Sequence, residues 1–365
     1  MRKDLRKMGI LFILLRLLTC ALYAIMDLRG ESMNVTIKDI ARMAQVSHTT
    51  VSRALNDSPL INSETKEKIK QLAQELGYTP NFSAKSLVMD RSYNIGLFFS
   101  TIQTGTSAGF FYETVRGVNS VVKDGYSLVV RGIDDYEHYR AIHRKSFDGV
   151  IVMSQSAKDE PFLVHLDAAG IPHIVLNRKV TGLKAVNILS DDAHGSFMAV
   201  EHMIRQGHRR IAIIEGKENF HSTIERKDGY LKALEKYGIP RDSRYELRGN
   251  YDLRSGHAAM RKLLKLDPAP TAVFCQNDDM AVGAMKAVAE AHLQVPRDIS
   301  VAGFDDSMFS AFLSPALTTV KRPIEEISRM GAAMLLECIE LKRLVPDTIY
   351  LHTELVVRES VRPLQ

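Results

Sequence analysis

One short stretch of the sequence carries polar side chains whose types and spacing suit hydrogen bonding to DNA bases. The stretch follows Ser47, which can cap a helix, and its polar residues fall opposite the apolar stripe of Val51 and Ala54. The polar members are His48, Thr49, Thr50 and Arg53. Arginine can donate two hydrogen bonds to guanine or bind a phosphate, and histidine and threonine can hydrogen-bond bases. The pattern predicts a DNA-reading helix; a small three-helix packing module with solvated polar residues is the alternative.

A second set of polar residues ends or follows predicted β-strands in the rest of the chain. Its members are Asn177, Asn277 and Asp305. Ligands of doubly wound sheets bind outside the carboxyl ends of the strands, so these positions favour a ligand site. A carboxylate accepts hydrogen bonds from paired hydroxyls and an amide both donates and accepts, which suits a polyol. The alternative for Asp305 is that it only caps a turn after its strand.

Three short helices are expected to position the DNA-reading residues. The first follows an N-cap at Thr36, the second runs from Ser47 to residue 55, and the third begins with Ser63 as its N-cap and ends at Gly77. A tight turn that contains Gln45 joins the first two. This is the helix-turn-helix arrangement, whose second helix enters the major groove of DNA.

After residue 93 the sequence alternates apolar β-rich runs with helical stretches, which predicts parallel, doubly wound sheets of the α/β class. The strands are expected at 95–100, 127–133, 149–154, 173–177, 185–190, 210–215, 245–249, 272–276 and 300–304. These are too many strands for one sheet of ordinary size, so we expect two lobes that divide near residue 191. A strand at 317–321, a helix at 324–341 and a strand at 349–357 would cross back to complete the lobes.

Composition and motifs exclude several classes of protein. The 365 residues are 45% hydrophobic and 25% charged, with a mean hydropathy of −0.10, as in ordinary globular chains. The three cysteines include no CxxC spacing, so no disulfide framework or cysteine zinc site is expected. Neither a phosphate-binding glycine fingerprint nor a nucleophile elbow is present, and His202 and His208 lack the spacing of a zinc site. We therefore expect no catalysis, no metal and no cofactor.

The N-terminal quarter of the chain holds all of the net positive charge of +5. Residues 1–32 carry +3, residues 33–92 carry +2, and the remainder is neutral. The first 32 residues combine basic residues with an apolar run at 9–26 that Arg16 interrupts. A central arginine costs about 2.5–3.5 kcal/mol in membrane insertion. We expect this extension to belong to no domain, with Met33 as the true start; a membrane tether is the alternative.

A series of linked motifs resembles the LacI/GalR family of bacterial transcription regulators from about residue 33 to the end. In the N-terminal part the motifs are VTIKDIARMAQVS at 35–47, TVSRALN at 50–56 and YTPN at 78–81. In the body they are RKDGY at 226–230, CQNDDMAVGA at 275–284, GFDD at 303–306 and LTTV at 317–320. The resemblance implies a periplasmic-binding-protein-like core of two lobes, a homodimer, and a hinge helix that folds on palindromic operator DNA.

The resemblance also implies further DNA contacts. Together with the helix residues above they are Thr36, Ser47, Asn56, Asn81, Ala84 and Leu87. Leu87 would insert into the minor groove, unstack a base step and bend the DNA; the alternative is an ordinary linker residue. Family members usually have glycine where this chain has Gln45, and a side chain at positive φ costs about 1–2 kcal/mol there.

For the cleft between the lobes, the resemblance transfers an effector-binding role to six residues. They are Arg226, Asn277, Asp305, Ser222, Tyr251 and Asn177. Arg226 offers a fork of donors and Tyr251 can stack on an apolar sugar face. We expect Arg226 and Asp305 to face a water-filled cleft in the free protein, so that neither would leave a buried partner behind if removed. The alternative for Arg226 is a bridge between the lobes.

The expected organisation is an N-terminal all-α helix-turn-helix head joined to an α/β two-lobed core. The domains are an extension (1–32), the head (33–77), a hinge (78–92) and an effector-binding and dimerisation domain (93–365), with lobe 1 at 93–191 and 323–345 and lobe 2 at 192–322 and 346–365. The predicted function is a cytoplasmic repressor whose operator affinity is controlled by a small molecule, with a sugar favoured over a nucleobase. A periplasmic-type sugar-binding receptor and a nucleotide-dependent enzyme are the rival classes; the first does not explain residues 36–92.

Overall fold

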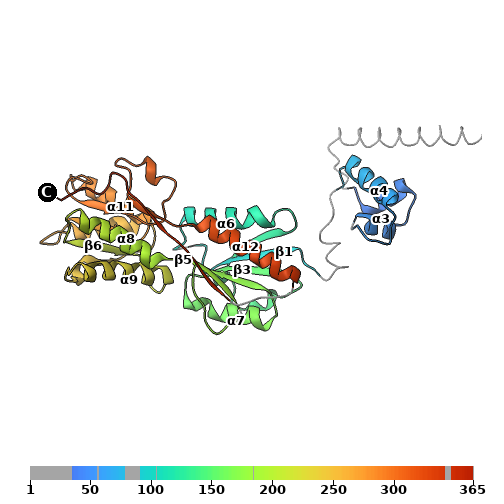
Figure 1. Ribbon diagram of the computed structural model, residues 1–365, viewed down its shortest axis with the longest axis horizontal. Helices are drawn as coiled ribbons and strands as arrows, with labels where there is room; N and C mark the ends of the chain where they lie inside the picture. The colour runs from blue at the N-terminus through green and yellow to red at the C-terminus, as the bar shows by residue number, and fades with distance from the viewer. Residues whose placement is uncertain are drawn as a thin grey trace, which may run out of the picture. The chain divides into compact units, whose positions relative to one another are not determined.

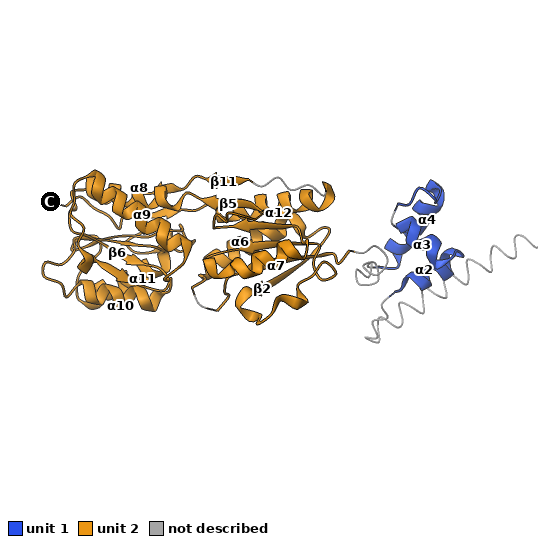
Figure 2. Ribbon diagram, turned by 90° about the horizontal axis from the view of Figure 1, so that it is seen from below, with its two compact units in different colours: residues 1–85 blue, residues 86–365 orange. Residues whose placement is uncertain are grey.

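The computed structural model describes residues 35–55, 57–78, 91–103, 105–183, 185–341 and 347–364. The chain divides into two compact units, residues 1–85 and 86–365 (Figure 2). The N-terminal extension and most of the predicted hinge lie outside the described residues, so the expectations for them stay predictions. Within the described ranges, no helix is both long and apolar enough to cross a membrane.

The first unit contains the three predicted helices around a small apolar core. They are α2 (Ile37–Ala44), α3 (His48–Leu55) and α4 (Ser63–Glu75). Ile40, Val51 and Ile69, one from each helix, are almost fully buried together. The predicted cap of α4 was wrong by one residue: Asn62 is the N-cap, and its Oδ1 accepts a hydrogen bond from the Thr65 amide at 2.8 Å. The helix-turn-helix prediction is otherwise confirmed.

Lobe 1 of the second unit is built on a six-stranded parallel sheet in the order β11-β5-β4-β3-β1-β2 (Figure 1). Its strands are β1 (Asn94–Phe99), β2 (Ser127–Gly132), β3 (Gly149–Met153), β4 (His173–Leu176), β5 (Val186–Ser190) and β11 (Thr348–Leu351). Helices α6 (Ala108–Val122) and α12 (Ile324–Leu341) cover one face, and α7 (Glu160–Ala168) covers the other. Successive residues Leu97 and Phe98 are fully buried in opposite layers, because a sheet covered on both faces has no polar side.

Lobe 2 repeats this arrangement on a four-stranded parallel sheet in the order β7-β6-β8-β9. Its strands are β6 (Ile211–Glu215), β7 (Glu246–Arg248), β8 (Ala272–Cys275) and β9 (Ser300–Ala302). Helices α8 (Asp192–Arg205) and α9 (His221–Lys236) pack on one face, and α10 (Leu253–Leu263) and α11 (Asp278–Glu290) on the other. The predicted α/β class with parallel, doubly wound sheets is confirmed.

Short 3-10 helices lie in the connections of the second unit. They are η1 (Ile133–Asp135), η2 (Tyr139–Ala141), η3 (Ala157–Asp159), η4 (Ser243–Tyr245) and η5 (Ser310–Phe312).

The C-terminal segment crosses between the lobes differently from the prediction. The expected strand at 349–357 is two strands: β11 pairs in parallel with β5 of lobe 1, whereas β12 (Glu354–Val356) pairs antiparallel with β10 (Thr319–Lys321). The assignment of all of 346–365 to lobe 2 is therefore wrong for β11. A single sequence contains no signal for which sheet a strand will join. The chain passes between the lobes at three places, after β5, after β10 and after β11.

Candidate functional site

Helix α3 exposes most of the polar side chains predicted to bind DNA. Ser47, His48, Thr49 and Arg53 are exposed, while Thr50 is half-buried. The Ser47 hydroxyl accepts a hydrogen bond from the Thr50 amide at 3.1 Å and lies 2.9 Å from the Thr50 hydroxyl. These two side chains therefore also hold the start of α3, which leaves His48, Thr49 and Arg53 as the exposed surface of the helix.

Of the other residues predicted to bind DNA, Thr36 lies within the described part of the chain. Thr36 is exposed, and its hydroxyl and amide both donate to the Asp39 carboxylate, at 2.6 and 3.1 Å, so this residue starts α2. Asn56, Asn81, Ala84 and Leu87 lie outside the described residues. Their contacts with DNA stay predictions.

The turn between α2 and α3 has the left-handed backbone that the family resemblance led us to expect. Gln45 has φ 57° and ψ 39°, and its amide reaches the carbonyl oxygens of Ala41 and Arg42. Replacing Gln45 with glycine removes the clash between Cβ and the backbone, so we expect the free energy of unfolding of the first unit to rise by about 0.5–1 kcal/mol. Thermal denaturation followed by circular dichroism would measure this. An unchanged or lower midpoint would contradict the strain argument.

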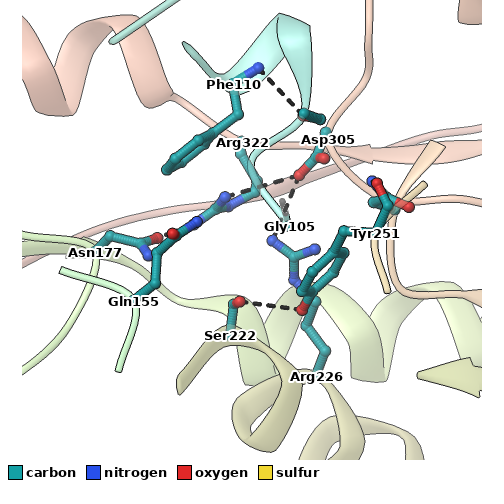
Figure 3. Close-up of a pocket in the computed structure, with 11 residues that line it drawn as sticks. Gly105, Phe110, Gln155, Asn177, Ser222, Arg226, Tyr251, Asp305 and Arg322 are labelled. Carbon is teal, nitrogen blue, oxygen red and sulfur yellow. Dashed lines mark hydrogen bonds and ion pairs between the residues drawn. The ribbon is translucent and has the colours of Figure 1, made fainter. Parts of the chain in front are cut away.

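In the second unit, all six residues predicted to bind the effector line one pocket (Figure 3). The pocket encloses about 310 Å³ of space between atoms, part of it open to solvent. The lining residues that the sequence did not indicate are Gly105, Ser107, Phe110, Gln155 and Arg322. Both lobes contribute, so the pocket lies at their junction.

Three of the predicted pocket residues lie at the carboxyl ends of strands in the two sheets. Asn177 follows β4 directly, and Asn277 and Asp305 follow β8 and β9 after one or two residues. Asn177, Tyr251 and Asp305 all have positive φ, at 69°, 61° and 115°. Non-glycine residues rarely adopt this conformation, and such strain clusters at ligand sites. The strand-end argument from the sequence thus placed its three residues together.

A buried ion network runs along the floor of the pocket. Arg226 Nε donates to Asp192 at 2.9 Å, and Arg322 Nε donates to the other oxygen of Asp192 at 3.1 Å. Asp305 Oδ1 lies 3.4 Å from Arg226 Nη2 and 3.7 Å from Arg322 Nη1. Arg226 and Arg322 are only 2% and 4% exposed, so two cations and two carboxylates form one enclosed group.

This network corrects the expectation that Arg226 faces a water-filled cleft. Its Nη1 also donates to the Gln276 carbonyl oxygen, and its guanidinium lies 3.9 Å from the centroid of the Phe304 ring. Removing this side chain would leave Asp192 buried with one cation fewer. Arg226 is therefore both a pocket residue and a structural one, because its guanidinium has enough donors for both roles.

The pKa values of the two carboxyls in the network are shifted in opposite directions. Burial favours the neutral form of Asp192, but Arg322 and Arg226 outweigh burial and hold the pKa of this carboxyl below its usual value. Burial raises the pKa of Asp305, although the same two arginines oppose the shift. Burial also lowers the proton affinity of Arg226, but Asp192 and Asp305 more than reverse this and raise its pKa. Asp192 is thus the fixed anion of the site.

The remaining predicted side chains combine structural contacts with a place in the pocket wall. The Tyr251 hydroxyl lies 3.1 Å from that of Ser222 and 2.8 Å from that of Thr223, which fixes the ring. A Cβ at Gly216 would meet this ring at 1.9 Å, so only glycine leaves room for it. Asn277 caps α11 through a 3.0 Å hydrogen bond from the Met280 amide. The contacts of its hydroxyl and the close packing on Gly216 make the ring of Tyr251 a rigid, flat part of the pocket wall.

Sequence reasoning missed Gln155, Asp192 and Arg322 for two different reasons. Gln155 follows β3 after one residue, so the strand-end rule that identified Asn177 could have found it. Asp192 and Arg322 lie where the chain passes between the lobes, after β5 and β10. The lobe boundaries expected near residues 191 and 322 fall at these two crossing points, but no pattern in the sequence assigned the charged residues there to the pocket.

Comparisons with known proteins agree with this architecture. The profile described as "Bacterial regulatory proteins, lacI family" matches residues 36–81, and that of a periplasmic binding protein-like domain matches residues 200–361. The chain is 52% identical over 330 residues to the probable HTH-type transcriptional repressor ExuR of Bacillus subtilis (strain 168), covering 90% of this chain and 99% of the relative.

Two solved structures are similar over nearly the whole chain. The transcriptional regulator CelR in complex with cellobiose is 32% identical, with a TM-score of 0.68 and coverage of 89% of this chain and 99% of that one. The lac repressor dimer bound to operator and an anti-inducer is 27% identical, with a TM-score of 0.76 and coverage of 90% and 100%. The chain therefore belongs to the LacI family of bacterial regulatory proteins, and it is a DNA-binding transcription regulator rather than an enzyme.

Proposed function

We propose that this protein is a cytoplasmic repressor that binds palindromic operator DNA as a homodimer. A sugar that occupies the pocket between the lobes lowers or raises the affinity for the operator. The observation that supports this most directly is the combination, in one chain, of an exposed α3 and a polar pocket lined by both lobes. The rival class, a periplasmic-type sugar receptor, does not bind DNA and therefore does not explain the exposed polar surface of α3. The solved relatives in complex with cellobiose and with operator DNA favour the same pairing of activities.

The geometry of the pocket supports control by a ligand. Asn177 and Gln155 extend from lobe 1, whereas Tyr251, Asn277 and Asp305 extend from lobe 2. A molecule that touches both sets binds best to one arrangement of the lobes and shifts the population toward it. Because linkage is reciprocal, the same ligand then changes operator affinity, typically by 5- to 150-fold.

Equilibrium DNA binding tests the proposal. A palindromic site is first selected from a random library, and fluorescence anisotropy then gives its affinity for the full-length protein with and without single sugars. We expect selective binding to the palindrome and a change of at least about fivefold with one sugar. Equal affinity for the selected site and for random DNA would overturn the regulator assignment. A change of affinity with a nucleobase alone would overturn the sugar assignment.

An exposed apolar loop of lobe 2 supports the homodimer. Met308 and Phe312 are each 84% exposed, and Phe309 between them is partly exposed. Large apolar side chains gathered in one loop are typical of protein interfaces. We propose that a second copy of the chain covers this loop.

Replacing Phe312 with aspartate should then yield monomers. We expect operator affinity to fall by roughly 10²- to 10⁴-fold, because two linked heads bind a palindrome far more tightly than one. Analytical ultracentrifugation and DNA titration measure both effects. The matched control is Val164→Asp, which places the same charge on a 53% exposed apolar residue of α7. A Phe312→Asp protein that stays dimeric would exclude this loop from the interface.

A further inference from the structure

Three of the motifs found in the sequence meet at one buried carboxylate in lobe 2. Asp278 belongs to the motif at 275–284, Gly303 to the motif at 303–306 and Thr319 to the motif at 317–320. Asp278 is the first residue of α11 and is fully buried, and the described lining of the pocket includes none of the three residues. Binding of an effector therefore does not account for this cluster.

The carboxylate of Asp278 accepts hydrogen bonds from two separate segments of the chain. Its Oδ1 accepts from the Thr319 hydroxyl of β10 at 2.6 Å. Its Oδ2 accepts from the Ser307 amide at 2.7 Å and from the Ser310 hydroxyl at 2.8 Å. The Gly303 backbone lies against the same carboxylate, because a Cβ there would be 2.1 Å from Oδ1. Asp278 thus joins α11 both to β10 and to the segment 307–310.

The segment that Asp278 holds belongs to the exposed apolar loop of lobe 2. Ser307 and Ser310 flank Met308 along the chain, and Phe312 follows two residues later. Ser310 is fully buried, whereas Met308 and Phe312 are each 84% exposed. The polar groups of the two serines therefore bind inward to Asp278, while the large apolar side chains stay at the surface.

The backbone bonds of the segment 307–312 form local turns. The Ser310 amide donates to the Ser307 carbonyl oxygen at 2.8 Å, and the one-turn helix η5 follows. The Leu317 amide donates to the Ser310 carbonyl oxygen at 2.9 Å. The two side-chain bonds to Asp278 tie this turn to α11, and through Thr319 they tie it to β10. The shape of the loop therefore depends on the Asp278 carboxylate as well as on its own backbone.

We propose that Asp278 is a positioning residue of the dimer interface, whose carboxylate fixes the segment 307–312 in the shape that a second copy of the chain binds. This inference rests on the proposed homodimer contact through the same loop. Holding the loop before association lowers the entropy that is lost when two copies meet. The affinity of the dimer then depends on a side chain that is itself buried inside one copy.

This arrangement accepts a neutral side chain in place of the carboxylate. Burial and the nearby carboxylate of Asp305 raise the pKa of Asp278 to about 7, although the hydrogen bonds from Thr319, Ser307 and Ser310 oppose the shift. A protonated Oδ1 can donate to the Thr319 hydroxyl, which then accepts, while Oδ2 still accepts from the other two groups. The Nδ2 group of an asparagine can donate in the same way. The geometry of the loop should therefore survive Asp278→Asn but not Asp278→Ala.

Analytical ultracentrifugation of the full-length protein tests the proposal. Ser310→Ala removes one of the three bonds and should raise the dimer dissociation constant at least about tenfold, since each dimer contains two such loops. Asp278→Ala should raise it further, whereas Asp278→Asn should stay within about threefold of the wild type. Ser196→Ala is the matched control, because Ser196 is a fully buried serine of α8 whose hydroxyl has no hydrogen-bond partner among the described residues.

Further measurements separate positioning of the loop from a general loss of stability. Asp278→Ala leaves the Ser310 and Thr319 hydroxyls buried without this acceptor, so its unfolding by urea is measured in parallel. Ser310→Ala removes the donor itself, and hydrogen exchange should become faster in the segment 307–312 while α11 keeps its wild-type protection. The affinity for a single operator half-site should stay at the wild-type value, because the head is a separate unit.

The role of Asp278 and the dimer contact fail differently. Wild-type dimer affinity in both Ser310→Ala and Asp278→Ala would overturn the positioning role. If Phe312→Asp yields monomers in the same experiment, the contact through the loop stands and the role of Asp278 alone is wrong. If Phe312→Asp stays dimeric, the loop is not the interface, and both the contact and the role of Asp278 are wrong.

Discussion

Replacing Arg53 with alanine is expected to lower strongly the preference of the protein for operator over random DNA. Arg53 is an exposed arginine in the helix that enters the major groove in this fold. A good bidentate contact contributes about 1–3 kcal/mol of discrimination, and a homodimer loses it twice. The ratio of specific to non-specific affinity should therefore fall by roughly 30-fold or more. Anisotropy titrations with the selected palindrome and with random DNA measure this ratio.

The control for this experiment removes the same charge elsewhere. Arg254→Ala acts on an exposed arginine of α10 in lobe 2, so operator affinity should stay unchanged. Calorimetry should show wild-type effector affinity for both variants, since Arg53 and the pocket lie in separate units. If the Arg53→Ala protein keeps the wild-type ratio of affinity for the palindrome to affinity for random DNA, α3 does not supply the specificity.

Replacing Arg226 with alanine is expected to destabilise the second unit as well as to abolish effector binding. The side chain is 2% exposed and pairs with Asp192, which is itself buried. Removing one partner of a buried ion pair costs about 3–5 kcal/mol, because the other charge stays desolvated. Here Arg322 still neutralises part of Asp192, so we expect a value at the lower end. Urea denaturation followed by circular dichroism gives the change in the free energy of unfolding.

Asp305→Asn is the matched comparison from the same network. Asp305 keeps 19% of its side-chain exposure, and its ion pairs of 3.4 and 3.7 Å are longer than those of Asp192. We expect effector affinity to fall ten- to a hundredfold while the free energy of unfolding changes by less than in Arg226→Ala. Equal stability of the Arg226→Ala protein and the wild type would contradict the structural role of the network.

Local patterns in the sequence were sufficient for most of the secondary structure and for the faces of the helices in the head. The alternation of apolar runs with helical stretches predicted strands β1 to β9, because covering both faces of a parallel sheet requires nearly continuous apolar strands. Helical spacing likewise separated buried Val51 and Ala54 from exposed His48 and Arg53. The positive φ of Gln45 was expected instead from the family resemblance, because family members usually have glycine at this position, and the structure confirms it.

The rule that ligands bind at the carboxyl ends of parallel strands also identified residues of the pocket. Asn177, Asn277 and Asp305 belong to three different strands, yet they line one pocket because parallel strands present their carboxyl ends at the same edge. The rule depends only on local order along the chain, so it needs no knowledge of the sheet order. Ser222, Arg226 and Tyr251 came instead from the family resemblance, and the structure places them in the same pocket.

Residue pattern alone was enough to predict the α/β class of the core, the three-helix head and three of the eleven described residues that line the pocket. The pairing of β11 with β5 and the buried ion network around Asp192 became known only from the tertiary structure. Arg322 and Asp192 are 130 residues apart and meet where the chain passes between the lobes. Such a contact depends on which strands pair across the two sheets, and pairing is set by packing of the whole domain, so no local pattern contains it.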